Sequence, residues 1–206
     1  MKSIGQQQLS LPSQAPLMVL PGAQLYPHVP LPLYIFEPRY RQMLAWSLEA
    51  DRMFCIASMK PGISEARATD DFYHVVGLGF VRACVGRDDG TSHLILQGLA
   101  RMRIVGFLQD KPFRIAELRE LTSTPPAAEE NDLLRIQMLK ESTKHFTGDA
   151  KMPENVEQEF GSIDDPAMMA DMIAHACLQD SEQRQAILEE LDVQKRVQLL
   201  LSYLRK

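Results

Sequence analysis

The sequence is poor in the features that mark secreted and membrane proteins. It has three cysteines, Cys55, Cys84 and Cys177, an odd number spaced too widely for a disulfide framework. No run approaches 18 apolar residues, and the N-terminal segment lacks the apolar region of a secretory signal. We therefore expect no membrane span, no signal peptide and a cytoplasmic location.

Motifs for phosphate binding and nucleophilic catalysis are also missing. There is no Gly-Lys dipeptide for a phosphate-binding loop, no Gly-x-Ser-x-Gly elbow, and no serine or threonine followed three residues later by lysine. The histidines have no partner at metal-ligand spacing, and His175 and Cys177 fall on different faces of an expected helix. The sequence thus predicts no catalytic residue, no cofactor and no metal. An enzyme with an unrecognised pocket stays an alternative.

What is present is the composition of a globular protein. The 206 residues are 45% hydrophobic and 24% charged, enough to bury a sizeable core. The net charge is −5, which does not favour a general nucleic-acid-binding protein. Residues 1–124 carry 13 basic and 11 acidic side chains, whereas residues 125–206 carry 9 and 16. This split predicts two structural parts that meet near Pro125-Pro126.

The first part has the pattern of a small curved sheet or barrel of about six strands and one helix. Apolar stretches bounded by Gly, Pro and Asp predict strands over 17–20, 29–36, 53–58, 72–87, 93–99, 101–108 and 113–121. The prolines of 29–36 favour an edge strand or an extended connection over a central strand, and Asp89-Gly90 predicts a hairpin turn. Pro38 predicts a helix start, with Tyr40, Met43, Leu44 and Leu48 buried and Asp51 at its end.

The second part has helical periodicity. The spacing of Leu133, Ile136, Leu139 and Lys140 predicts one helix that ends near residue 148, and a short helix is expected over 153–160. The remaining helices are expected to begin at the caps Asp165, Ser181 and Asp192. The inner face of the Asp165 helix is expected to hold Met169, Met172, Ile173 and Ala176. The fold class is therefore α+β.

The run Phe36–Arg41 places charged groups at the start of the expected helix. A structural interpretation pairs Glu37 with Arg101 or Arg103 of a neighbouring strand. A functional interpretation makes the same helix end the rim of a peptide-binding surface, with Glu37, Arg39, Tyr40 and Arg41 as contacts.

Several segments, in order along the chain, resemble the N-terminal domain of Lon proteases. Leu25–His28 and Leu31–Arg41 resemble the opening of that domain, Val76–Gly79 its glycine-bearing strand, and Leu94–Ile104 its most characteristic run. The helical part of the domain is resembled by four short stretches: Asp165-Pro166, Ala170-Asp171, Ile187–Glu189 and Leu191–Arg196. The resemblance implies a PUA-like β-barrel followed by a helical bundle. We accordingly expect a flexible tail (1–15), a barrel subdomain (16–124) and a bundle subdomain (125–206).

The resemblance extends to substrate engagement only, because the ATPase and Ser-Lys protease parts of Lon have no counterpart here. It implies a non-enzymatic protein that binds polypeptide segments or a protein partner, on the barrel or in the barrel–bundle cleft. The alternative is an RNA-binding PUA-like module in which Arg82, Arg87, Arg101 and Arg103 cluster. The client and the oligomeric state stay open.

Overall fold

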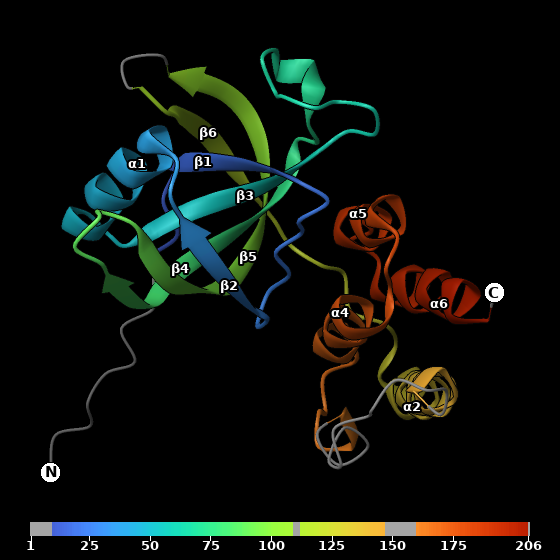
Figure 1. Cartoon of the computed structure of the whole chain (residues 1–206). Coiled ribbons are helices and arrows are strands. Elements are labelled where there is room, and N and C mark those ends of the chain that lie inside the picture. The colour runs from blue at the N-terminus through green and yellow to red at the C-terminus, as the bar shows by residue number, and fades with distance from the viewer. Residues whose placement is uncertain (1–9, 109–111, 147–159, 206) are drawn as a thin grey trace, which may run out of the picture.

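The protein has a β-rich part followed by a helical part (Figure 1). The computed structural model describes residues 10–108, 112–146 and 160–205. The strands are β1 (Gln14–Pro21), β2 (Pro30–Ile35), β3 (Met53–Met59), β4 (Val75–Gly86), β5 (Ser92–Leu108) and β6 (Arg114–Leu121). Helix α1 (Pro38–Glu49) lies between β2 and β3, and a short 3₁₀ helix, η1 (Thr69–Asp71), precedes β4. The α+β prediction is confirmed.

The strands form one six-stranded sheet that closes on itself. Their order is β2-β5-β4-β3-β1-β6, and β6 pairs back with β5. The β1–β3 pair is parallel, and the other pairs are antiparallel. Strand β2 stays outside the ring, attached to the first half of β5. Its place at the edge is the one that Pro30 and Pro32 predict.

Strand β5 makes the closure possible by bending instead of ending. It is one strand of 17 residues, so the expectation of two strands, 93–99 and 101–108, is wrong. Register shifts leave Leu99 and Val105 of β5 without a partner residue in β4 and β6 respectively, and Arg82 of β4 without a partner in β5. Such bulges bend a strand without ending its pairing. At Gly98 a side chain would collide with the carbonyl oxygen of Tyr26, so the chain before β2 can lie directly against β5.

Helix α1 packs against β1 and β3 through the apolar stripe that the sequence predicted. Pro38 stands in the first turn, and Tyr40, Met43 and Leu44 are buried together with Ser47, whereas Leu48 is only half-buried. The helix ends at Glu49, two residues before the expected Asp51. Its buried residues form one core with Phe54, Ile56 and Leu96, and the residues that alternate with these in β3 belong to a separate core.

The helical part contains α2 (Asn131–Phe146), α4 (Pro166–Cys177), α5 (Ser181–Glu189) and α6 (Val193–Leu204), preceded by a 3₁₀ turn, η2 (Ala128–Glu130). Asp165 and Asp192 cap α4 and α6 through hydrogen bonds from Ala167 and Lys195, as predicted. The cap of α5 is Asp180, not Ser181, because the Asp180 carboxylate accepts from the Gln183 amide. The predicted helix 153–160 lies, apart from Phe160, outside the described residues.

Two helix faces differ from the prediction. On α2, Leu133 and Ile136 are 61% and 63% exposed, while Leu134 and Met138 are buried against α4 and α6. On α4, Ala176 is exposed, and Ala170, Ala174 and Cys177 turn inward. Each helix is apolar on two overlapping stripes, so its periodicity alone does not decide which stripe meets the neighbouring helices.

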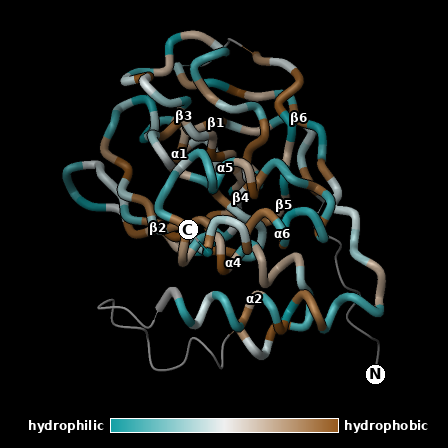
Figure 2. The backbone as a smooth tube through the Cα atoms, turned by 90° about the vertical axis from the view of Figure 1, so that its right-hand side faces the viewer, coloured by the Kyte–Doolittle hydropathy of each residue, from teal (hydrophilic) through white to brown (hydrophobic). Residues whose placement is uncertain are grey.

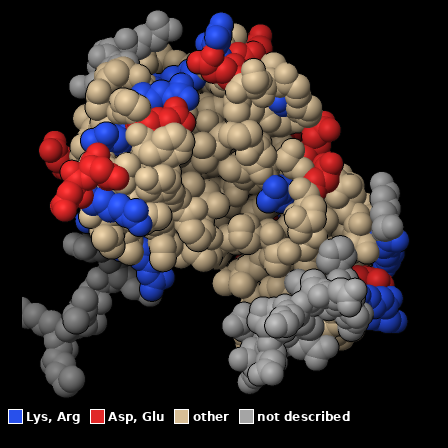
Figure 3. Space-filling model, viewed as in Figure 1, with Lys and Arg blue, Asp and Glu red and all other residues tan. Residues whose placement is uncertain are grey.

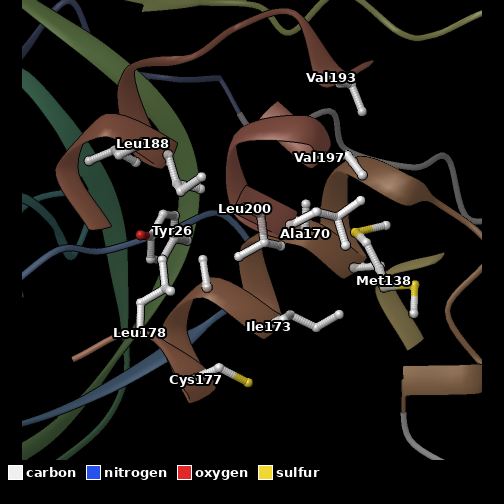
Figure 4. Close-up of a cluster of buried hydrophobic side chains, with 14 of the residues drawn as sticks. Tyr26, Met138, Ala170, Ile173, Cys177, Leu178, Leu188, Val193, Val197 and Leu200 are labelled. Carbon is white, nitrogen blue, oxygen red and sulfur yellow. The ribbon is translucent and has the colours of Figure 1, made fainter. Parts of the chain in front are cut away.

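The core of the bundle also includes residues of the barrel. Tyr26, Val29 and Val75 pack among Leu178, Leu188, Leu200 and the other buried residues of the helices (Figure 4). The Tyr26 hydroxyl donates to the Arg184 carbonyl at 2.7 Å. Figure 2, turned toward the helices, shows α2 on the side away from the strands, with α4, α5 and α6 between. Three residues of the β-rich part thus complete the core of the bundle, while the strands have two further cores of their own.

Candidate functional site

The four predicted contact residues lie at the start of α1, where Glu37 is the N-cap. Its Oε2 atom accepts from Arg39, 2.9 Å from Nε and 2.8 Å from NH2. The expected pairing of Glu37 with Arg101 or Arg103 is wrong, because Arg101 points to the helices instead. The Glu37–Arg39 pair is local and half-exposed, and such pairs contribute little to stability.

Tyr40 is the buried member of this group. Its hydroxyl donates to the Val19 carbonyl at 3.0 Å and accepts from the Val19 amide at 3.2 Å. Burial raises the pKa of Tyr40, so the side chain stays neutral. The Arg39 guanidinium lies over the ring, 4.6 Å from its centroid. The Tyr40 ring, which its hydroxyl anchors to the Val19 backbone, thus supports the Arg39 guanidinium.

Arg39 and Tyr40 line a pocket that sequence reasoning missed, here called the arginine pocket. It has a volume of about 450 Å³ and lies between α1, the loop before η1 and the ends of β5 and β6. Arg67 from the loop and Arg114 from β6 complete its basic wall. Figure 3 shows charged side chains of both signs at the top of the molecule, over α1 and η1. Arg41 lies on another side of α1, beside Gly90, so the four predicted residues do not share one site.

A second surface feature is apolar, here called the outer strip: Pro32, Tyr34, Phe36, Val85, His93 and Ile95. Pairing of β2 and β4 with β5 sets Pro32 and Ala83 beside Ile95, and Tyr34 and Val85 beside His93. Phe36 and Val85 are 58% and 67% exposed. The β2–β5–β4 part of the strip borders a hollow of about 480 Å³. In Figure 3 most of the face over β2 is uncharged, with charges at its margins.

Ring stacking holds the outer strip in one arrangement. The Tyr34 ring lies 4.7 Å from His93 and 5.7 Å from Phe36, both at an interplanar angle of 27°. Rings held in this way lose little conformational freedom when a ligand covers them. An exposed apolar surface that is already ordered marks an interaction site.

The free edge of β2 is poorly suited to pairing with another strand. The Val29 carbonyl accepts a hydrogen bond from the Gly98 amide. Because backbone groups alternate along a strand, the N–H and C=O groups of Leu31, Leu33 and Ile35 also point toward β5. The backbone groups of residues 30, 32 and 34 therefore point to the free edge of the sheet. Two of these residues are prolines, which have no N–H to donate. The free edge of β2 therefore offers few backbone N–H groups for the addition of a further strand.

The barrel–bundle cleft, the other expected docking place, is filled by a buried cluster, here called the junction: Arg101, Asp171 and Arg196. Arg101 makes a bidentate pair with Asp171, with distances of 2.8 and 2.5 Å, and donates from Nε to the Leu188 carbonyl. Arg196 lies 3.4 Å from the same carboxylate and donates to the Glu190 carbonyl and the Ser123 hydroxyl. The pKa of Arg196 is lowered to about 10, mainly by burial and in second place by repulsion from Arg101.

The junction also separates the arginines of the RNA alternative. Arg101 is buried, and Arg103 of β5 pairs with Val75, which lies seven residues before Arg82 in β4. At about 3.3 Å per residue, this places Arg82 and Arg103 roughly 23 Å apart. The expected cluster of four arginines does not form.

Other candidate chemistries find no support in the part of the chain that the structure describes. Within residues 10–108, 112–146 and 160–205, no group of three or more His, Cys, Asp or Glu side chains is placed to hold a metal ion. Over the same residues, no helix has the length and apolar character needed to cross a membrane.

Comparison with known proteins gives a consistent result. The model of the ATP-dependent protease La (LON) substrate-binding domain family matches residues 14–206. Lon proteases of Escherichia coli K12 and Desulfosudis oleivorans are both 24% identical, over 92% and 91% of this chain. The chain spans only 24% and 23% of those two proteins, about a quarter of their length.

Solved structures show the same fold. The N-terminal domain of the Mycobacterium avium complex Lon protease has a TM-score of 0.75 at 15% identity, covering 94% of this chain and 98% of that one. A Lon N-terminal domain protein from Xanthomonas campestris has a TM-score of 0.66 at 18% identity, covering 92% and 98%. At these identities the likeness establishes the architecture alone.

Proposed function

The chain belongs to the Lon substrate-binding domain family, and on this premise we propose that it binds polypeptide segments and catalyses no reaction itself. The family name supports binding of a substrate, and the matched region is the substrate-binding part of the relatives. The observation that carries the proposal is the outer strip, an ordered apolar surface beside a hollow. Such surfaces are used for recognition of apolar segments.

The outer strip would bind an extended segment through its apolar side chains. Covering one large apolar side chain contributes about 1.5–3 kcal/mol, and ordering the segment opposes this gain. The resulting affinity is weak and tolerant of sequence, which suits a surface that meets many unfolded segments. The prolines at the free edge of β2 limit hydrogen bonding to the main chain of a bound segment. Binding would therefore depend on how many apolar side chains the segment has.

The residues at the start of α1 would flank the bound segment. Phe36 ends the strip, and Glu37 and Arg39 follow it directly in the sequence. The Glu37–Arg39 pair would then form a polar rim at this end of the strip, whereas Arg41 lies on another side of α1 and Tyr40 is buried beneath Arg39. A polar rim around an apolar centre is the usual arrangement of a binding surface.

A peptide titration tests the proposal. Fluorescent peptides that are acetylated, amidated and free of acidic residues would carry either aromatic and leucine residues or serines at the same positions. We expect the apolar peptide alone to raise the anisotropy of the sample. The double variant Tyr34→Ser/Ile95→Thr should weaken binding about tenfold or more, because two contact side chains lose their apolar surface.

The matched control is Val105→Thr, which changes a residue 58% exposed on the other half of β5. It should leave the affinity unchanged. Absence of apolar-peptide binding to the unmodified protein would contradict the proposal. So would equal losses in the strip variant and the Val105 control.

A further inference from the structure

We infer that the arginine pocket binds a carboxylate of a polypeptide, either a C-terminal carboxylate or an Asp or Glu side chain, with an adjoining apolar side chain on the pocket floor. The inference rests on the proposed function for the source of the ligand. It concerns a different surface, and it adds a requirement for charge that the outer strip does not have.

The charge of the pocket wall is the first argument. Arg39, Arg67 and Arg114 line it, and they come from a helix, a loop and a strand. Their acidic neighbours, Glu37, Glu65 and Asp71, are not among the lining residues. The remaining titratable side chain is Tyr40, whose hydroxyl is occupied by the Val19 backbone. Among the described residues the wall is thus purely cationic.

The guanidinium groups of the pocket are held by partners that a ligand can replace or leave in place. Arg114 is held by its NH2, which donates to the carbonyls of Ala66 and Arg67 at 2.9 Å each. Arg39 rests on the Tyr40 ring and donates from Nε and NH2 to Glu37, in a half-exposed pair. Arg67 pairs with Glu65 at 2.7 Å, but its side chain is 82% exposed, and such pairs exchange easily with other anions. The guanidinium group of an exposed arginine can bind a carboxylate through a bidentate pair of hydrogen bonds.

The floor of the pocket supplies the apolar half of the site. Leu17, Phe107 and Phe113 line it below the arginines, and Phe107 is packed edge-on against Phe72 at 6.0 Å. The volume of about 450 Å³ falls in the range of small-ligand sites. A cationic wall above an apolar floor fits an amino-acid residue that has both a carboxylate and an apolar group beside it.

The position of the pocket allows one polypeptide to use both surfaces. Phe36 of the outer strip and Arg39 of the pocket are three residues apart, so their Cα atoms lie within about 11 Å.

Small blocked amino acids test the inference apart from the outer strip. The probes are N-acetylphenylalanine with a free carboxylate, its amide, and N-acetyl-Phe-Asp-amide, whose single carboxylate is in a side chain. Binding would be followed by NMR chemical shifts at low and high salt. We expect one or both carboxylate probes to bind at least about tenfold more tightly than the amide, and to weaken as salt rises. Which of the two binds identifies the source of the carboxylate.

The variant Arg39→Gln/Arg67→Gln removes two exposed charges and should abolish the preference for a carboxylate. The control Arg119→Gln removes one exposed charge on β6 and should keep that preference. Equal binding of the acid and amide probes to the unmodified protein overturns the inference, as does an unchanged preference in the double variant. Neither result affects the blocked apolar peptides, whose failure to bind would instead reject the proposed function.

Discussion

The junction and the arginine pocket show two uses of the same side chain. In the junction, the side chains of Arg101 and Arg196 are 3% and 0% exposed and share one carboxylate. In the pocket, Arg39 and Arg67 are 41% and 82% exposed and pair with neighbours two residues away. A buried charge must be matched inside the protein, whereas an exposed charge can exchange its partner for a ligand. The junction therefore supports the fold, and the pocket is available for binding.

The largest expected effect is loss of the carboxylate at the junction. Asp171→Ala leaves two buried guanidinium groups without their counter-ion, which costs about 3–5 kcal/mol of the free energy of unfolding. Urea denaturation followed by circular dichroism measures this loss. Asp88→Ala, in the exposed β4–β5 turn, is the control and should leave the midpoint unchanged. Equal midpoints for the two variants would remove the distinction between junction and pocket.

A variant without any change of charge tests the position of Tyr26, whose side chain packs among the helices. Gly98→Ala forces a methyl group onto the Tyr26 carbonyl and should cost about 1–3 kcal/mol. The matched variant Gly161→Ala meets no atom within 4 Å and should fold normally. If Gly98→Ala is as stable as the unmodified protein in urea, close packing of Tyr26 against β5 is not what holds the barrel to the bundle.

The stability of the protein at alkaline pH depends on thiols that are buried in the cores of both parts. Burial raises the pKa of the Cys177 thiol to about 12 and that of Cys55 in the same direction. Because the folded protein keeps these protons longer than the unfolded chain, stability is full below the ordinary thiol pKa and falls as pH rises above it. Each thiol contributes a slope of up to about 1.4 kcal/mol per pH unit.

Urea midpoints between about pH 8 and 10 measure this slope. Cys177→Ala should make this slope shallower than that of the unmodified protein. Equal slopes in the two proteins would contradict burial of a protonated thiol at Cys177. Arg196 acts in the opposite direction only above about pH 10, because its lowered pKa is about 10.

The smallest expected effect is on the stability of the pocket variant. Arg39→Gln/Arg67→Gln breaks two exposed ion pairs, and such pairs add little to stability. Its urea midpoint should therefore match that of the unmodified protein while its affinity for the carboxylate probes falls. A large drop of the midpoint would show that these arginines, like those of the junction, serve the fold.

The elements that the sequence predicted are those with local causes. Pro30 and Pro32 predicted the edge strand, and Asp165 and Asp192 predicted two helix starts. The exposed face of α2 was predicted wrongly, because its two apolar stripes are distinguished only by packing on α4 and α6.

The candidate site shows the same limit. Arg39 and Tyr40 could be selected because they follow a helix-start motif. Arg114 reaches the Arg67 carbonyl across 47 residues of sequence, so nothing local pointed to it. The outer strip was missed because β2 is apolar on both faces, and alternation is visible only when the faces differ in polarity.

The most direct test of the account is a map of amide chemical shifts on addition of an apolar peptide that ends in a free carboxylate. The account predicts shifts along β2 and the paired part of β4 and β5, and around Arg39, Arg67 and Arg114. The amides of α2, α4 and α6 should not move. Shifts confined to the helices, or none in the barrel at saturating peptide, would contradict the assignment of binding to the barrel and of support to the junction.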